Sequence, residues 1–127
     1  MLDTDTVSMA LRGRGAVGAR VLEHRPSRVC LSSITLAELR FVANSKGSRR
    51  LHALIDTFVA TIAVLSFDQA ASDRFGRVAT ALAKRGEPIG TFDTLIAAHA
   101  QSLGLTLVTT NTRHFRRVTG LKVTNWI

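Results

Sequence analysis

The stretch FDTLIAAHAQSLGLTLV, residues 92–108, joins a helical pattern to a strand pattern. Apolar residues recur at helical spacing over 92–103, and Gly104 marks the end of that helix. Leucine and β-branched residues then fill 105–108 as a short strand. A helix that leads directly into a strand is the repeating unit of parallel sheets, so this stretch predicts an α/β fold.

The same alternation extends through the rest of the sequence. The predicted strands are 1–4, 29–34, 62–65, 105–108 and 122–125. The predicted helices are 35–44, 51–61, 68–85 and 92–103. We therefore expect one parallel sheet covered by helices on both faces, with its working site beyond the carboxyl ends of the strands.

The composition indicates a globular chain with an excess of positive charge. Among 127 residues, 17 Lys and Arg stand against 9 Asp and Glu, which leaves a formal net charge of +8. The hydrophobic fraction of 46% excludes wholesale disorder, and the length suits a single domain over 1–127. The positive charge favours a polyanionic partner, with nucleic acid ahead of an anionic membrane.

Membrane insertion and export are both disfavoured by the sequence. The longest apolar stretch, 58–67, falls short of the about 20 residues that a bilayer-spanning helix needs. Asp3 and Asp5 stand where an export signal would carry basic residues. The single cysteine, Cys30, offers neither an internal disulfide nor a cysteine-based zinc site. We expect a cytoplasmic protein with no membrane partner.

Polar side chains gather at the predicted ends of the strands. They are Asp3, Asp5, Glu38, Asp93 and Asn111. In a parallel sheet these positions meet at one rim. Carboxylates gathered there repel one another unless a cation neutralises them, and their oxygen atoms suit Mg²⁺ or Mn²⁺.

Each acidic residue also has a purely structural explanation. Glu38 stands three residues after Thr35 and fits a capping box. Asp93 would complement a helix dipole, and Asp5 would serve as a helix N-cap, which is the explanation we favour for Asp5. Asp3 gains little from structure alone at the end of an apolar strand. The residue pattern by itself therefore leaves a metal site and a structural role both open.

Four segments in series carry a more specific signal. They are MLDTDT at 1–6, SITLAELRF at 33–41, IGTFDTLIAAHA at 89–100, and LVTTNTRHF at 107–115 followed by GLKVTNW at 120–126. In this order and spacing they resemble the PIN domain, and within that family the VapC-type toxins of bacterial toxin–antitoxin modules. The resemblance implies a single PIN-like ribonuclease domain over 1–127, built on a central four- to five-stranded parallel sheet flanked by helices.

The resemblance also implies an activity and its site. It makes the chain the toxin of a type II toxin–antitoxin module, an Mg²⁺-dependent endoribonuclease, with Mn²⁺ as an alternative ion and RNA, tRNA among the candidates, as substrate. Asp3, Glu38 and Asp93 match the three family acids and would hold the metal, and Asn111 completes the catalytic set. Three positions bear on the family pattern. Asp5 stands where Asn is usual, and His114 stands where an acid is common. Asn111 stands near where many PIN domains place a fourth acid, although Asn is common in the VapC-type branch.

An apolar surplus on two predicted helices points to a protein partner. The residues are Leu36, Leu39, Phe41, Val42, Leu51, Leu54, Ile55 and Phe58, rimmed by Arg40, Lys46, Arg49 and Arg50. One stripe can pack on the sheet, and the surplus predicts an exposed patch of the kind that marks interfaces. In the family resemblance this groove receives a helix of the cognate antitoxin. We therefore expect a toxin–antitoxin hetero-oligomer and a toxin homodimer formed through another face.

Other functions fit parts of the sequence. A non-catalytic PIN-like RNA-binding subunit would be favoured by loss of the acids, yet Asp3, Glu38 and Asp93 are all present. A Mg²⁺-dependent small-molecule phosphatase would need an Asp-x-Asp motif after the first strand, which residues 3–5 match, but a well-placed catalytic lysine is missing. His99 and His114 could act as general acids, and we rank both as packing or substrate contacts.

Overall fold

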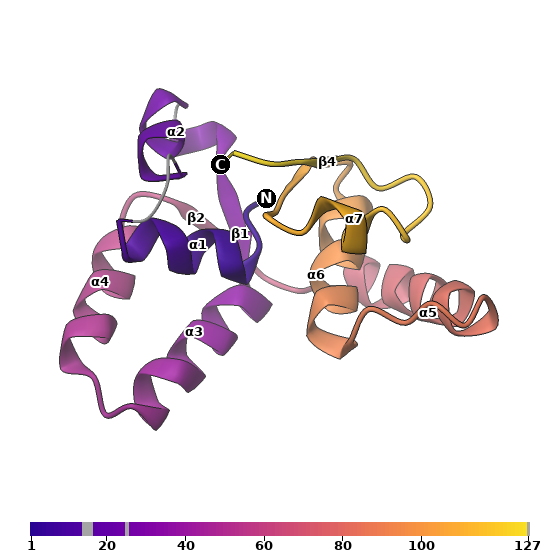
Figure 1. Cartoon of the computed structure of the whole chain (residues 1–127), viewed down its shortest axis with the longest axis horizontal. Coiled ribbons are helices and arrows are strands. Elements are labelled where there is room, and N and C mark those ends of the chain that lie inside the picture. Colours follow the sequence, from indigo (N-terminus) through magenta and orange to yellow (C-terminus); the bar gives the residue numbers. More distant parts are fainter. Residues whose placement is uncertain (14–16, 25, 127) are drawn as a thin grey trace.

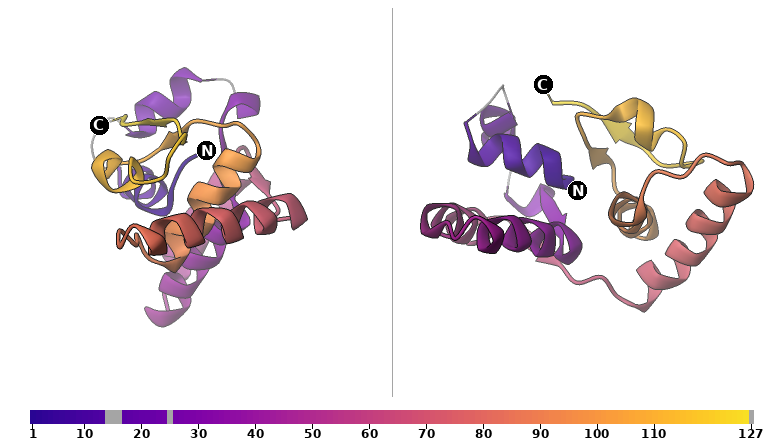
Figure 2. Two further views of the ribbon diagram at one scale, coloured as in Figure 1. Left: turned by 90° about the vertical axis from the view of Figure 1, so that its right-hand side faces the viewer. Right: turned by 60° about the horizontal axis from the view of Figure 1, so that its bottom comes forward.

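The computed structural model, which describes residues 1–13, 17–24 and 26–126, consists of short strands surrounded by helices (Figure 1). The helices are α1 (Thr4–Leu11), α2 (Val17–Glu23), α3 (Ser33–Ser45), α4 (Arg49–Val59), α5 (Gln69–Lys84), α6 (Thr91–Ser102) and α7 (Thr112–Phe115), with a 3₁₀ turn at Pro26–Arg28. The strands are β1 (Cys30–Ser32), β2 (Ala63–Leu65), β3 (Leu107–Val108) and β4 (Val123–Thr124). The hairpin of α3 and α4 lies on the opposite side of the molecule from α5 (Figure 2).

The strands form two parallel pairs. β1 pairs with β2, with Cys30 opposite Ala63, and β3 pairs with β4, with Leu107 opposite Val123. Each strand is two or three residues long, which is shorter than the sequence predicts. The structure therefore has an α/β arrangement whose parallel strands form two small sheets in the described residues, and one continuous four- to five-stranded sheet is not shown.

Residue 2 connects the two pairs. Leu2 forms isolated parallel bridges to Leu31 in β1 and to Val108 in β3. The Leu2 N–H donates to the Cys30 carbonyl at 2.8 Å, and the Asp3 N–H donates to the Val108 carbonyl at 3.0 Å. The predicted first strand over 1–4 is therefore wrong in its extent, because only one residue of it pairs.

The first strand is short because a helix begins immediately after it. The Asp3 carboxylate accepts the Thr6 N–H at 2.9 Å and so caps α1, which starts at Thr4. The prediction that Asp5 is the N-cap is wrong by two residues. The expectation that Asp3 gains little from structure is also wrong, because Asp3 is the cap. The cap turns the chain into a helix at the edge where the candidate site lies.

Helices α3 to α6 begin and end within two residues of the predicted positions, whereas α1, α2 and α7 have no counterpart among the predicted helices. Asp68, the first residue of the helix predicted over 68–85, is the N-cap of α5 and accepts the Ala71 N–H at 2.9 Å. Gly104, with φ of 66°, follows α6 in the left-handed conformation that glycine tolerates, which confirms it as the helix stop. The capping box at Thr35 and Glu38 is wrong, since α3 begins at Ser33 with Ser32 as its N-cap. Glu38 is thereby free of a capping role.

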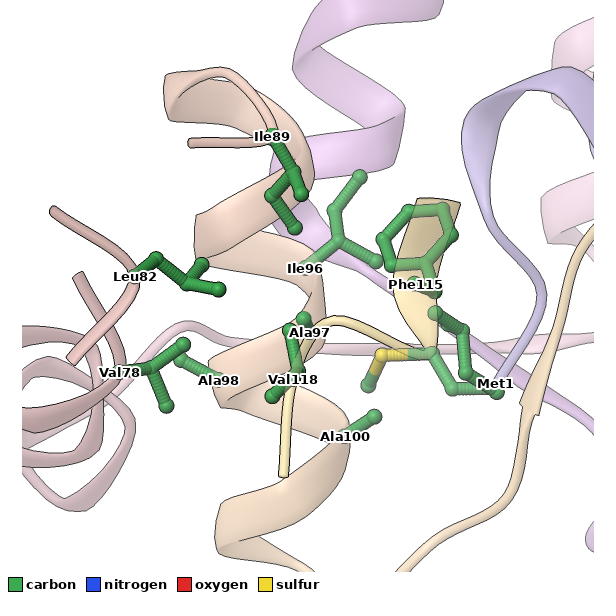
Figure 3. Close-up of a cluster of buried hydrophobic side chains, with 11 residues drawn as sticks. Met1, Val78, Leu82, Ile89, Ile96, Ala97, Ala98, Ala100, Phe115 and Val118 are labelled. Carbon is green, nitrogen blue, oxygen red and sulfur yellow. The ribbon is translucent and has the colours of Figure 1, made fainter. Parts of the chain in front are cut away.

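The core consists of two clusters of buried apolar residues. The first joins α5, α6 and the C-terminal segment, and Figure 3 shows Met1, Ile96 and Phe115 lying side by side in it. The second joins α1, α3 and α4 through Leu2, Val7, Leu39 and Ile55, among others. Leu2 and Leu107 are fully buried, so apolar packing fixes the segment that carries Asp3.

None of the helices in the described ranges is both long enough and apolar enough to cross a bilayer.

His99 belongs to this core. It is 1% exposed, its Nδ1 lies 2.8 Å from the Ser32 hydroxyl, and its ring meets Phe67 edge-on. Burial lowers the pKa of His99 below its usual 6.5, although the charge of Asp68 opposes the shift. The structure thus places His99 as a packing residue that is neutral in the folded state.

We predict a pH dependence of stability from His99. Below about pH 6.5 the imidazole of His99 is protonated in the unfolded chain, whereas its lowered pKa keeps it neutral in the folded chain. The free energy of unfolding therefore falls as the pH falls. In His99→Gln this contribution disappears, while the raised pKa values of the site carboxylates act equally in both proteins. Urea denaturation of the two proteins between about pH 7 and pH 5 measures the difference. Parallel pH profiles would show that His99 does not titrate in this way.

Candidate active site

Three of the predicted site residues come together where the parallel segments end. Asp3 follows the bridge residue Leu2, Glu38 lies on α3 after β1, and Asp93 lies in the first turn of α6. They are close enough for the charges of Asp3 and Asp93 to raise the pKa of Glu38. The prediction that these residues share one rim agrees with this placement.

Asp3 is the most deeply buried of the three acids, with 3% of its surface exposed. Burial raises its pKa, and hydrogen bonds from the Thr109 hydroxyl and from Thr6 oppose that shift. The charge of Asp5 raises the pKa further. Asp3 therefore has two roles in one side chain, because it caps α1 and carries a carboxylate into the site.

Glu38 is half-buried and held by a neighbouring hydroxyl. The Thr4 Oγ1 donates to Glu38 Oε1 at 2.6 Å. Burial is the main cause that raises the pKa of Glu38, followed by the charges of the other acids, while the Thr4 hydrogen bond lowers it. Thr4, the first residue of α1, thus fixes the orientation of an acid on α3.

Asp93 is paired with His114. The His114 Nε2 lies 3.1 Å from Asp93 Oδ2 and 2.9 Å from the Ile89 carbonyl oxygen. Since both neighbours are acceptors, Nε2 carries the proton. Burial raises the pKa of Asp93, and the charge of Asp3 adds to this, whereas His114 lowers it.

His114 is a site residue that the sequence did not assign. It was ranked as a packing or substrate contact, but the structure places it against one of the candidate metal ligands. The contact joins α6 to α7 across 21 positions of the chain, so no local sequence pattern predicts the pairing of His114 with Asp93. The sequence offers two signals for His114: it is a titratable side chain shortly after the strand that ends at Val108, and it stands where the PIN resemblance commonly has an acid.

Asn111 is the N-cap of α7. Its side chain accepts the His114 N–H at 3.4 Å, and its own N–H donates to the Thr109 hydroxyl at 3.0 Å. These contacts make Asn111 a positioning residue for His114. Its direct participation in catalysis stays a prediction.

A cavity of about 530 Å³ opens beside the acids. Asp5 and Glu38 line it together with Arg12, Phe41 and Phe92, among others. Asp5 is exposed, and its charge raises the pKa of the three buried or half-buried acids. The cavity gives solvent, and any ligand, access to Glu38.

The donor atoms at this rim suit a hard divalent cation. Carboxylate oxygens are the ligands that Mg²⁺ and Mn²⁺ prefer. Burial is the main cause that raises the pKa of Asp3, Glu38 and Asp93, and the charges of neighbouring acids add to it, a repulsion that a bound cation would relieve. Among the described residues, no three His, Cys, Asp or Glu side chains stand in a metal-holding arrangement. Each acid is instead engaged by protein donors, namely Thr6 and Thr109 on Asp3, Thr4 on Glu38 and His114 on Asp93.

Comparison with known proteins identifies the class. A family model described as PIN domain matches residues 1–121. The chain belongs to the PIN-domain family.

The chain is also similar to named relatives and to solved structures. The chain is 40% identical over 127 residues to the tRNA(fMet)-specific endonuclease VapC of Shigella flexneri, covering 99% of this chain and 96% of the relative. It superposes with a TM-score of 0.93 and 36% identity on DNA-bound VapBC from Salmonella typhimurium, covering 100% of this chain and 97% of that one. For promoter-bound VapBC2 from Rickettsia felis the TM-score is 0.90 at 30% identity, covering 100% and 98%.

Proposed function

We propose that this chain is a divalent-metal-dependent endoribonuclease and the toxin of a type II toxin–antitoxin module. The observation that carries the proposal is the gathering of Asp3, Glu38 and Asp93 within reach of one another's charge. The names of the chain's relatives add a substrate class, since the Shigella flexneri relative is named a tRNA(fMet)-specific endonuclease. We infer that RNA, tRNA included, is the substrate, and that the chain acts on it in the cytoplasm as a single ribonuclease domain.

Asp3, Glu38 and Asp93 would hold the ion, which we propose to be Mg²⁺ or Mn²⁺. When bound, such an ion lowers the pKa of a water nucleophile and neutralises charge that develops on the phosphodiester. The protein's own residues prepare the site. Thr4 orients Glu38, and His114 holds Asp93 through its Nε2 proton.

Asn111 contributes to the proposed site indirectly, through His114. By capping α7 it sets the position of His114 and therefore of Asp93. Its side-chain amide is both donor and acceptor, so it could also orient a water without adding charge to the site. We keep it in the proposed catalytic set on these grounds.

We also propose that the strands work as one parallel sheet in the order β2, β1, residue 2, β3 and β4. The support is the pair of bridges from Leu2 to Leu31 and Val108. In this arrangement the segment that carries Asp3 is central, which suits the burial of Asp3. This is the four- to five-stranded sheet of the PIN resemblance in a short form.

The competing functions have less support. A non-catalytic RNA-binding subunit does not need Asp3, Glu38 and Asp93 in one place. A phosphatase that uses Asp3 as nucleophile needs a well-placed catalytic lysine, which the sequence lacks.

We propose a cognate antitoxin as the protein partner, in a hetero-oligomer that also contains a toxin homodimer. The support is a groove of about 420 Å³ between α1, α3 and α4, with Leu51 and Leu54 among its apolar lining and Lys46 and Arg50 on it. The patch is smaller than the sequence predicts, since Leu39 and Ile55 are buried in the core. The solved relatives are VapBC complexes, which agrees with a partner of this kind.

We predict that reversing charge at Arg49 and Arg50 weakens antitoxin binding. Both side chains are exposed at the start of α4, whereas Arg40 is already paired with Asp56 at 2.5 Å. Arg49→Glu with Arg50→Glu should raise the dissociation constant of the antitoxin roughly tenfold and leave kcat for RNA cleavage within about twofold. Titration calorimetry with the purified antitoxin and a cleavage assay give the two numbers. Equal loss of both would place these arginines at the RNA site instead.

A further inference from the structure

Two aromatic side chains stand exposed beside the candidate site. Phe41 is 73% exposed and Phe92 is 55% exposed, more than any other large apolar side chain in the described part of the chain. Both line the cavity of about 530 Å³ that also contains Asp5 and Glu38. Exposed apolar surface of this kind marks a binding site when it is grouped around a cavity.

The sequence places one aromatic residue next to each of two acids. Phe41 follows Glu38 by three positions on α3, so the two side chains share a face of the helix. Phe92 directly precedes Asp93 in the first turn of α6. Gly90, with φ of 92°, provides the backbone turn from which that helix starts. Both rings are therefore fixed to the helices that carry the carboxylates.

The remaining lining of the cavity suits a nucleic acid strand. Arg12 supplies a cation for a phosphate, and the hydroxyl side chains of Thr4 and Ser8 supply polar contacts. Aromatic faces with a nearby cation are how proteins bind single strands, by stacking bases on the rings and pairing the backbone with positive charge. The chain as a whole carries +8, which favours the same class of ligand.

We propose that Phe41 and Phe92 form a stacking platform for unpaired bases of the RNA substrate, next to the phosphate on which the carboxylates act. The inference rests on the function proposed above and adds a substrate requirement to it. In a duplex the base faces are already stacked on each other, so the platform selects single-stranded or loop nucleotides. Phe41 and Phe92 act as substrate-binding residues and leave the metal ligands untouched.

The test measures RNA affinity without cleavage. An Asp93→Asn background is combined with Phe41→Ala, Phe92→Ala, or neither, and a short single-stranded oligoribonucleotide containing 2-aminopurine is titrated in. Each alanine change should weaken binding about 5- to 150-fold and reduce the quenching of 2-aminopurine that stacking produces. The slope of log affinity against log salt concentration should stay unchanged, because no phosphate contact is lost. Phe→Trp should restore affinity at either position, and Phe→Leu should not.

Leu103→Ala is the matched control. Leu103 is 45% exposed at the end of α6 and does not line the cavity, so its removal should leave affinity unchanged. Full affinity in Phe→Leu, equal binding of the same strand annealed to its complement, or loss of antitoxin binding with unchanged RNA binding would overturn the stacking platform. If the wild-type protein cleaves RNA, and the alanine variants bind RNA as tightly as the Asp93→Asn protein without them, only this inference fails. If the wild-type protein neither binds nor cleaves RNA, the proposed function fails with it.

Discussion

Asp93→Asn is expected to reduce RNA cleavage by at least about 10³-fold, since a metal ligand contributes several kcal/mol to stabilising the transition state. Asparagine has the shape of aspartate, and its side-chain oxygen can still accept a hydrogen bond from the His114 Nε2–H. The hydrogen bond at 3.1 Å therefore has a replacement. The change therefore removes one negative charge and little else. Steady-state cleavage of a defined RNA by the purified variant measures the loss.

Controls separate this effect from damage to the fold. Burial and the charge of Asp3 raise the pKa of Asp93, so removing its charge should leave the metal-free protein melting at or above the wild-type temperature. Asp73→Asn removes a charge from α5 and should leave cleavage unchanged. Wild-type rates from Asp93→Asn, with contaminating nuclease excluded by a mock preparation, would remove Asp93 from the mechanism.

The second large effect is expected from metal removal. Excess EDTA should abolish cleavage, Mg²⁺ or Mn²⁺ should restore it, and Ca²⁺ should bind with little turnover because its coordination is looser. The reason is that Asp3, Glu38 and Asp93 offer hard oxygen ligands, and a bound cation would offset the burial and the charge repulsion that raise their pKa values. Cleavage rates across a metal titration give the measurement. Full activity in chelator would indicate a metal-free ribonuclease.

The acids of the candidate site could be predicted from the sequence because each lies shortly after a strand or in the first turns of a helix. Asp3 follows the bridge residue Leu2, Asp93 lies in the first turn of α6, and Glu38 lies in the second turn of α3 after β1. The helix stop at Gly104 and the start of α5 at Asp68 could also be predicted from the sequence, because both depend on local backbone signals.

Contacts between distant segments could not be predicted in the same way. The hydrogen bond from Thr4 to Glu38 spans 34 positions, and that from His114 to Asp93 spans 21. Both depend on how α1, α3, α6 and α7 pack. The N-terminal strand was overestimated because the apolar Met1 and Leu2 suggested an extended segment, whereas the cap at Asp3 starts α1 at once.

Direct binding of Mn²⁺ tests most closely whether the three carboxylates form one cation site, and it is insensitive to contaminating nuclease. Asp3→Asn, Glu38→Gln and Asp93→Asn each remove one charge and keep an acceptor for Thr6, Thr4 or His114. Titration calorimetry should show binding to the wild-type protein and to Asp73→Asn, and binding at least about tenfold weaker in each of the three variants. Unchanged Mn²⁺ affinity in all three variants would contradict a shared cation site at this rim.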